Sequence, residues 1–453
     1  MTEPLKSVLI ANRGEIALRV IRACKELGIK SVLAYSEADA QSLPVQLADQ
    51  AVCIGPAQVA QSYRNAQAVI SAALAYKVDA IHPGYGFLSE NADFAALCED
   101  EGVTFVGPAS DVIRRMGDKI EAKKIARRAG VPTVPGSVGA VSEYREALAI
   151  ANEVGYPMLI KAAAGGGGRG MRVVETAETL ERDLAEIMSE AETAFGDPSV
   201  YIERYLTDIR HIEIQVISDG ETVLHLGERD CTAQRRNQKL IEESPSPALD
   251  DTLRRGLSEA ATALCREVGY RNAGTVEFVF DNIDRTYYFI EMNTRIQVEH
   301  PVTEMVTGLD LIKMQLQIAG GQPITLTQDD VRLNGHAIEC RINAEDPQNG
   351  FAPSPGVVGA FRAPGGFGVR LDSHVQAGYA IPPFYDSMIG KLICWGNDRD
   401  EAIERAIRAL DELVVDGIIT TADFHKEILR STKFSHGHFN TAFVAELLAA
   451  RVG

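Results

Sequence analysis

The segment from Glu291 to His300 constrains the fold most strongly, because its polar and apolar residues alternate. Its odd positions carry Glu, Asn, Arg, Gln and Glu, whereas its even positions carry Met, Thr, Ile, Val and His. In an extended strand, alternate side chains lie on the same face. An extended segment would therefore place all five odd side chains on one polar surface.

A second apolar strand, Thr275–Phe280, precedes this segment across a short polar turn. A hairpin between the two strands places Glu277 opposite Glu291. Adjacent carboxylates repel each other unless a cation lies between them. The set of hard ligands is formed by the carboxylates of Glu277 and Glu291 and the side-chain oxygen of Asn293. Such a set suits Mg²⁺ or Mn²⁺ bound together with nucleotide phosphates. The alternative is a solvated polar strand face, which is less favoured because an Arg, a Gln and a third Glu continue the pattern.

Other polar residues allow two explanations each. Glu339, Arg341 and Asn343 alternate with apolar residues, which fits either a functional strand or a salt-bridged structural one. His211 could be a ligand contact or a structural histidine. A basic cluster is either a functional patch or a solvated run of charge, and it comprises Arg229, Arg235, Arg236 and Lys239.

A run of glycines, Gly165–Gly168, lies between two expected strands, Met158–Ala162 and Met171–Val174. With Arg169 and Gly170 it matches G-x-G-x-x-G, but no helix follows to hold a pyrophosphate, so a Rossmann site is not indicated. The pattern instead predicts an antiparallel hairpin whose backbone N–H groups approach phosphates closely and which hinges as a lid. The alternative is a merely flexible surface hairpin.

The first hundred residues alternate short strands with helices, which predicts a doubly wound parallel sheet. Strands are expected at Ser7–Ala11, Ser31–Tyr35, Ala80–His82 and Val103–Val106, with a helix over Glu15–Leu27. From about residue 206 onward strands dominate, which predicts a C-terminal domain with a mainly antiparallel sheet. The fold class is therefore α/β, or α+β overall.

The formal net charge of −18 argues against nucleic acid or an anionic membrane as the main partner. No apolar run approaches a membrane span, and the first residues do not indicate a signal peptide. The seven cysteines are scattered without a C-x-x-C pair, which is typical of reduced thiols in a cytoplasmic protein.

A glycine hairpin, lysines ahead of it and a Glu…Glu-x-Asn strand together resemble the ATP-grasp ligases. Longer motifs narrow the resemblance to biotin carboxylase and cover the chain from about residue 5 to 448. These motifs are ANRGEI (11–16), HPGYGFLSEN (82–91), MGDK (116–119), GGGRGM (166–171), EMNTRIQVEHPVTE (291–304), CRINAEDP (340–347) and DSMIGKL (386–392).

The resemblance implies that MgATP, bicarbonate and biotin react through carboxyphosphate to give N1-carboxybiotin, ADP and phosphate. The implied nucleotide contacts are Lys119, Lys161, Gly167, Gly168, Glu203, Leu206, His211, Gln234 and Asn237. At the position of Asn237 many family members have His. The implied metal ligands, Mg²⁺ or Mn²⁺ being the metal, are Glu277, Glu291 and Asn293. The implied bicarbonate contacts are Lys239, Arg295, Gln297 and Val298. Glu299 is implied as the general base and Arg341 as the residue that stabilises the biotin enolate beside Arg295.

The resemblance also implies an N-terminal domain at 1–114, a lid at 115–205, an ATP-grasp core at 206–330 and a C-terminal domain at 331–453. No Met-Lys-Met biotinylation site is present, so biotin is expected on a separate biotin carboxyl carrier protein, with carboxyltransferase subunits downstream, most often in acetyl-CoA carboxylase for fatty-acid synthesis. A homodimer is implied through Arg22, Glu26, Phe367 and Arg370. The alternatives are an ATP-grasp ligase with another acceptor and a regulatory subunit that binds nucleotide without catalysis.

Overall fold

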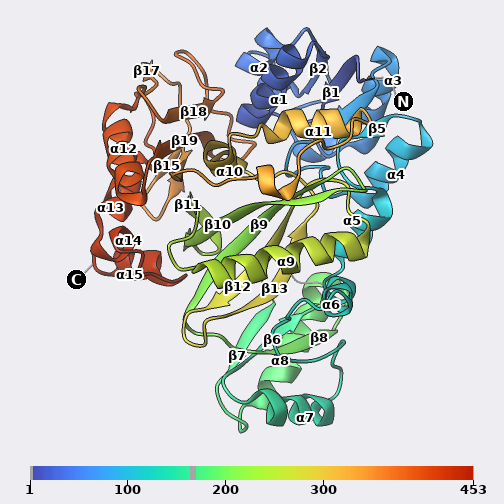
Figure 1. Ribbon diagram of the computed structural model, residues 1–453, viewed down its shortest axis with the longest axis vertical. Coiled ribbons are helices and arrows are strands. Elements are labelled where there is room, and N and C mark those ends of the chain that lie inside the picture. Colours follow the sequence, from blue (N-terminus) through green and yellow to red (C-terminus); the bar gives the residue numbers. More distant parts are fainter. Residues whose placement is uncertain (1–3, 164–169, 452–453) are drawn as a thin grey trace.

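The structure is a computed structural model that describes residues 4–163 and 170–451. Figure 1 shows the predicted N-terminal domain in blue, the predicted lid in teal at the lower end, and the C-terminal region in orange and red. A large central sheet in green and yellow connects them. Among the described residues, no helix is both long and apolar enough to cross a membrane.

The N-terminal domain contains the predicted parallel sheet, in the order β3-β2-β1-β4-β5. Its strands are β1 (Ser7–Ile10), β2 (Lys30–Tyr35), β3 (Gln50–Cys53), β4 (Ala80–His82) and β5 (Thr104–Phe105). The helices are α1 (Gly14–Leu27), α2 (Leu43–Leu47), α3 (Ala66–Tyr76), α4 (Ala92–Asp100) and α5 (Ser110–Gly117), with 3-10 turns at Glu37–Asp39 and Val59–Gln61.

Helix α1 ends where the sequence predicts, at a glycine. Gly28 adopts a left-handed conformation (φ 69°), and its N–H caps the carbonyls of Cys24 and Lys25. A side chain is disfavoured in this conformation, whereas glycine adopts it freely. One face of α1 packs into an apolar core shared with α11 (Leu311–Ala319), which ties the N-terminal sheet to the central part of the chain.

The lid has the predicted strands on either side of the glycine run. β6 (Met158–Ala162) pairs antiparallel with β7 (Met171–Val174) on one side and with β8 (Val200–Arg204) on the other. Lys161 lies opposite Met171, and Gly165–Gly168 fall outside the described residues. The helices of this region are α6 (Lys119–Arg128), α7 (Tyr144–Val154) and α8 (Leu180–Phe195).

The central sheet has eight strands in the order β13-β12-β9-β10-β11-β14-β19-β18, all paired antiparallel. The first five in the chain are β9 (Ile209–Ser218), β10 (Val223–Arg235), β11 (Gln238–Ser244), β12 (Asn272–Asp281) and β13 (Thr286–Asn293). The sheet is completed from the C-terminal region by β14 (His336–Asn343), β18 (Val369–Ser373) and β19 (Met388–Gly396). It therefore crosses residue 330, and the fourfold division of the chain stays a prediction.

Helices cover this sheet. α9 (Asp251–Val268) packs on β9 and β10, and α10 (His300–Thr307) packs on β10, β11, β14 and β19. The C-terminal helices are α12 (Arg399–Glu412), α13 (Ala422–Arg430), α14 (Thr432–Ser435) and α15 (Phe443–Ala449). The remaining short elements are β15 (Glu345–Asp346), β16 (Ala352–Pro353), β17 (Phe361–Arg362), β20 (Val414–Val415) and a 3-10 turn at Gln328–Asp330.

The extended conformation expected for Glu291–His300 is wrong beyond Asn293. Strand β13 ends at Asn293, the chain then turns, and Glu299 is the N-cap of α10 with φ −81° and ψ 7°. Pro301 explains the change, because proline is favoured in the first turn of a helix and has no N–H to donate in a strand ladder. The register expected upstream is confirmed, since Glu277 pairs with Glu291.

Candidate active site

A pocket of about 650 Å³ lies between the lid and the central sheet. It is lined by every sequence-predicted site residue that the structure describes: Lys119, Lys161, Glu203, Leu206, His211, Gln234, Asn237, Lys239, Glu277, Glu291, Asn293, Arg295, Gln297, Val298, Glu299 and Arg341. Gly167 and Gly168 lie outside the described residues. Residues as far apart in the chain as Lys119 and Arg341 therefore line one pocket, and their individual roles stay predictions.

The two carboxylates on β12 and β13 have opposite electrostatic environments. Burial alone would raise the pKa of Glu277, but Lys239 and His211 hold it well below its ordinary value. The pKa of Glu291 is raised by burial and then by the adjacent charge of Glu277, against the effect of Lys119. A divalent cation would relieve this repulsion, so the pair fits the predicted metal site.

Glu277 has donors at both of its carboxylate oxygens. One of its oxygens accepts hydrogen bonds from Lys239 (3.1 Å), Asn293 (2.9 Å) and Gln297 (2.7 Å). His211 Nε2 lies 3.1 Å from the other oxygen. His211, Glu213 and Glu277 also lie close enough together to serve as ligands of one metal ion.

Lys239 is the cationic centre of the pocket. Its Nζ donates to Glu213 (2.7 Å), Glu277 (3.1 Å) and Glu299 (2.6 Å). Burial would lower its pKa, but these carboxylates and the buried Cys231 raise it well above its ordinary value. Lys239 is therefore a permanent ammonium that is held by three anions.

Glu299 is a buried carboxylate between two cations. It accepts from Lys239 (2.6 Å) through one oxygen and from Arg341 (3.1 Å) through the other. Although burial favours its protonated form, Lys239, Arg341 and Arg229 hold its pKa well below its ordinary value. Glu299 is thus ionised, as a group that accepts a proton must be.

Two guanidinium groups lie beside this base. Arg295 donates from Nε to Glu90 (2.8 Å) and from Nη2 to the side-chain oxygen of Asn293 (2.8 Å). Arg341, on β14, donates to Glu242 (2.5 Å) as well as to Glu299. The pKa of Glu242 is raised to about 7, chiefly by burial, against the effect of Arg341.

The lid end of the pocket carries a separate charge cluster. Glu203 on β8 accepts from Lys161 (2.6 Å) and from Lys123, and both lysines lie over the ring of Tyr201. These two cations hold the pKa of Glu203 below its ordinary value despite burial. Asn237 occupies the β10–β11 turn with φ 66°, a left-handed conformation that asparagine tolerates better than most residues.

Sequence reasoning missed several residues that contact the predicted set. Lys123 lies four residues after Lys119 on α6, a helical spacing that could have indicated it. Glu213 lies two residues after His211 on β9, so strand alternation could have indicated it. Glu90 occurs within a recognised motif. Glu242 had no local signal, because its partner Arg341 comes from a distant strand. Arg229 belongs to the basic cluster that the sequence indicates, but the sequence does not show its partners.

At the expected dimer positions, Arg22 and Glu26 are exposed on α1, and Phe367 is 77% exposed. Arg370 instead donates to Glu304 (2.7 Å) and Asp372 (2.6 Å) within the chain. The exposed aromatic ring beside charged groups is compatible with a protein contact, and the dimer surface stays a prediction.

Comparisons with known proteins match nearly the whole chain. Residues 4–113 match the family "Biotin carboxylase, N-terminal domain", and residues 118–327 match "Carbamoyl-phosphate synthase L chain, ATP binding domain". Residues 339–446 match "Biotin carboxylase C-terminal domain". The chain is 57% identical to biotin carboxylase 1 of Bacillus subtilis, over 97% of this chain and 98% of that one.

Solved biotin carboxylase structures are also similar to this chain over nearly its whole length. A biotin carboxylase–β,γ-ATP complex from Campylobacter jejuni superposes with a TM-score of 0.93 at 49% identity, covering 98% of this chain and 99% of that one. The biotin carboxylase domain dimer of the 2-oxoglutarate carboxylase from Hydrogenobacter thermophilus superposes with a TM-score of 0.91 at 48% identity, covering 98% of each chain. That structure contains MgADP, ADP and bicarbonate.

Proposed function

The chain belongs to the biotin carboxylase family, and on that premise we propose that its pocket uses ATP and bicarbonate to carboxylate biotin on a separate carrier protein. The products are N1-carboxybiotin, ADP and phosphate. The observation that carries the proposal is the convergence of the Glu277–Glu291 pair with Lys239, Arg295 and Glu299 in one pocket. This ligase reaction is the first half-reaction of a biotin-dependent carboxylase.

The lid end of the pocket binds the nucleotide. Lys119 and Lys161 contact the phosphates, and Glu203, Leu206, His211, Gln234 and Asn237 surround the adenosine end. Gly167 and Gly168, which the resemblance also assigns to the nucleotide, lie outside the described residues. Glu277, Glu291 and Asn293 hold Mg²⁺ or Mn²⁺, which neutralises phosphate charge during phosphoryl transfer. The side-chain oxygen of Asn293 accepts from Arg295 in this structure, so it would exchange that partner for the metal.

The sheet end of the pocket binds bicarbonate. Lys239, Arg295 and Gln297 offer N–H donors, and the Val298 carbonyl is held by Lys391 (2.8 Å). A planar guanidinium matches the geometry of a small oxyanion. Glu299 removes the bicarbonate proton so that the oxyanion attacks the γ-phosphate and forms carboxyphosphate. The ion pairs of Glu299 with Lys239 and Arg341 keep this base ionised before substrate binds.

Arg341 acts in the second step. Carboxyphosphate releases CO₂ and phosphate. The released phosphate accepts the N1 proton of biotin, and the resulting enolate forms the N1–C bond with CO₂. Arg341 is a permanent cation at the pocket edge, since Glu242 and Glu299 raise its pKa further although burial lowers it. Such a fixed charge stabilises a developing oxyanion. Arg295 lies in the same pocket as its catalytic neighbour.

We propose a biotin carboxyl carrier protein and carboxyltransferase subunits as partners, in an acetyl-CoA carboxylase or a related enzyme in the cytoplasm. The solved relatives include the biotin carboxylase domain of a 2-oxoglutarate carboxylase and the biotin carboxylase subunit of a pyruvate carboxylase. The 2-oxoglutarate carboxylase domain is a dimer, which supports a homodimer here. We propose Arg22, Glu26, Phe367 and Arg370 as contacts of that dimer.

The decisive experiment measures ADP release by the purified chain with MgATP, adding bicarbonate and free biotin separately and together. We expect release to require bicarbonate and to be accelerated by biotin, with label from ¹⁴C-bicarbonate appearing in carboxybiotin. Bicarbonate-dependent ADP release that biotin leaves unchanged, with no labelled carboxybiotin, would indicate a different acceptor. No ADP release under any condition would overturn the enzymatic proposal.

A further inference from the structure

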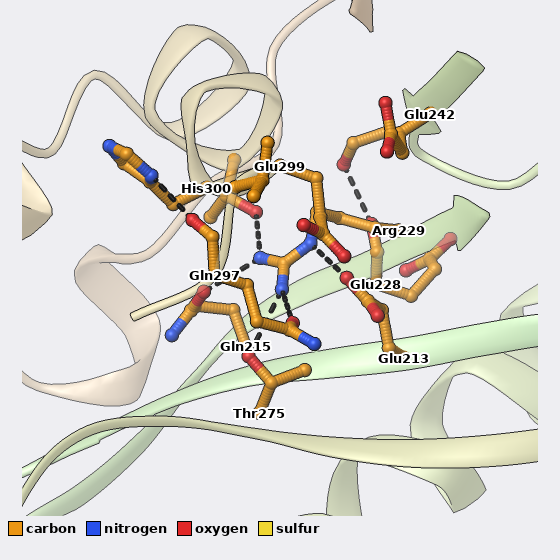
Figure 2. A network of polar contacts seen from close by, with 12 residues as sticks. Glu213, Gln215, Glu228, Arg229, Glu242, Thr275, Gln297, Glu299 and His300 are labelled. Carbon is orange, nitrogen blue, oxygen red and sulfur yellow. Dashed lines mark hydrogen bonds and ion pairs between the residues drawn. The ribbon is translucent and has the colours of Figure 1, made fainter. Parts of the chain in front are cut away.

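Arg229 lies beneath the pocket, outside its lining, with a side chain that is 0% exposed. Figure 2 shows its guanidinium surrounded by acceptors from several segments of the chain. Nε donates to Glu213 (2.5 Å), Nη1 to Gln215 (2.7 Å) and Thr303 (3.0 Å), and Nη2 to Thr275 (3.0 Å) and Gln297 (2.8 Å). A guanidinium has five N–H donors, and here all five have acceptors.

The first consequence concerns the amide of Gln297. Its side-chain oxygen accepts from Arg229, so its NH₂ group must point in the opposite direction. There Nε2 donates to Glu277 at 2.7 Å, on the side that faces the pocket. Arg229 therefore decides that Gln297 presents a donor, and not an acceptor, to an anion in the pocket.

The second consequence concerns Lys239. The Glu213 carboxylate contacts two cations: Oε1 accepts from Arg229, and Oε2 accepts from Lys239 at 2.7 Å. With one oxygen held by Arg229, the other has a fixed position against the Lys239 ammonium. The Lys239 ammonium is thereby located between Glu213, Glu277 and Glu299.

We propose that Arg229 is a positioning residue that sets the donor face of the bicarbonate site, directly through Gln297 and indirectly through Glu213 and Lys239. The inference rests on the proposed function, because bicarbonate is the anion that those donors bind. Arg229 itself contacts no substrate. Lysine could not replace it. An ammonium has three N–H donors on one nitrogen, whereas the planar guanidinium directs five donors from three nitrogens toward acceptors on both of its sides.

The test compares Arg229→Lys and Arg229→Met with the wild-type chain in biotin-dependent ADP release. We expect KM for bicarbonate to rise by about 10-fold or more in both variants, as the loss of a charged hydrogen-bonding partner predicts. We expect KM for ATP to change by no more than about 2-fold, since the lid contacts do not involve Arg229. A purely structural role would lower thermal stability without separating the two KM values.

Thr275→Val is a milder variant, because it removes only the second acceptor of the same Nη2 group that holds Gln297. We expect KM for bicarbonate to rise about 3-fold in this variant. If Arg229→Met does not fold, Thr275→Val still tests the positioning role of Arg229. Arg399→Met is the matched control. It removes a largely buried guanidinium paired with Glu243 (2.6 Å), outside the pocket lining. We expect it to reduce stability and leave KM for bicarbonate unchanged.

Unchanged KM for bicarbonate in both Arg229→Lys and Thr275→Val would overturn the proposal for Arg229. An equal rise in the KM values for ATP and bicarbonate would also overturn it, because the effect would then be general. These outcomes differ from a failure of the proposed function, in which the wild-type chain itself would show no bicarbonate-dependent ADP release.

Discussion

Glu277 and Glu291 lie directly opposite each other in the β12–β13 pair, and the two carboxylates respond in opposite directions. The pKa of Glu277 is well below its ordinary value, whereas burial and Glu277 raise the pKa of Glu291. The difference arises because Lys239 and His211 both lie on the Glu277 side. A bound cation would therefore stabilise the ionised form of Glu291 more than that of Glu277.

Glu291→Gln therefore tests the metal site. We expect kcat/KM for MgATP to fall by about 100-fold, because a neutral amide is a weaker ligand for a hard divalent cation. Saturating Mg²⁺ should restore part of the activity. The measurement is ADP release over a Mg²⁺ titration, with the exposed Glu259→Gln on α9 as the control. Identical Mg²⁺ dependence in Glu291→Gln and wild type would contradict the metal assignment.

Glu299→Gln tests the general base. The amide keeps the size of the side chain but cannot accept the bicarbonate proton, so we expect biotin-dependent turnover to fall by about 10²- to 10⁴-fold. Binding of MgATP, measured by calorimetry, should stay close to the wild-type value, because Glu299 lies at the sheet end of the pocket. Near-normal turnover in this variant would remove Glu299 from the mechanism.

Arg341→Ala separates the two steps of the reaction. The guanidinium stabilises the biotin enolate, so we expect carboxybiotin formation to fall by about 100-fold or more. Bicarbonate-dependent ATP cleavage without biotin should fall less. The two rates are compared in one preparation, and Arg341→Lys, which keeps the charge, should recover part of the carboxylation. Equal losses in both rates would count against an enolate-specific role.

Glu243 provides a prediction for stability against pH. Burial alone would raise its pKa, but Arg399 and His336 lower it from the ordinary 4.5 to about 2. The stabilisation is therefore present above pH 4.5 and is lost as the pH falls toward 2, an effect of about 3 kcal/mol. Thermal melting should show Glu243→Gln well below wild type at pH 7, with the gap narrowing toward pH 3.

The control for that experiment is Glu181→Gln, which alters an exposed carboxyl group in the first turn of α8. We expect it to melt within about 1 °C of wild type at both pH values, as surface substitutions usually do. A gap between Glu243→Gln and wild type that is independent of pH would show that the ion pair does not control acid stability.

Much of the local structure follows from residues close together in the chain. The period-two pattern of β12 and β13, joined by a short turn, predicts the Glu277–Glu291 register that the structure contains. Alternating strands and helices likewise predict the parallel N-terminal sheet. Beyond Asn293 the same alternation is misleading, because Pro301 favours the start of α10 over a continued strand.

By itself, the sequence determined which chemical groups are available and, through its motifs, which family the chain resembles. Only the tertiary structure decided that Glu242 pairs with Arg341, that Lys123 joins Lys161 at Glu203, and that Arg229 lies beneath the pocket. Periodicity is a property of neighbouring residues, so it can be read along the chain. The meeting of β10, β11 and β14 depends on core packing summed over hundreds of residues, and no local pattern contains it.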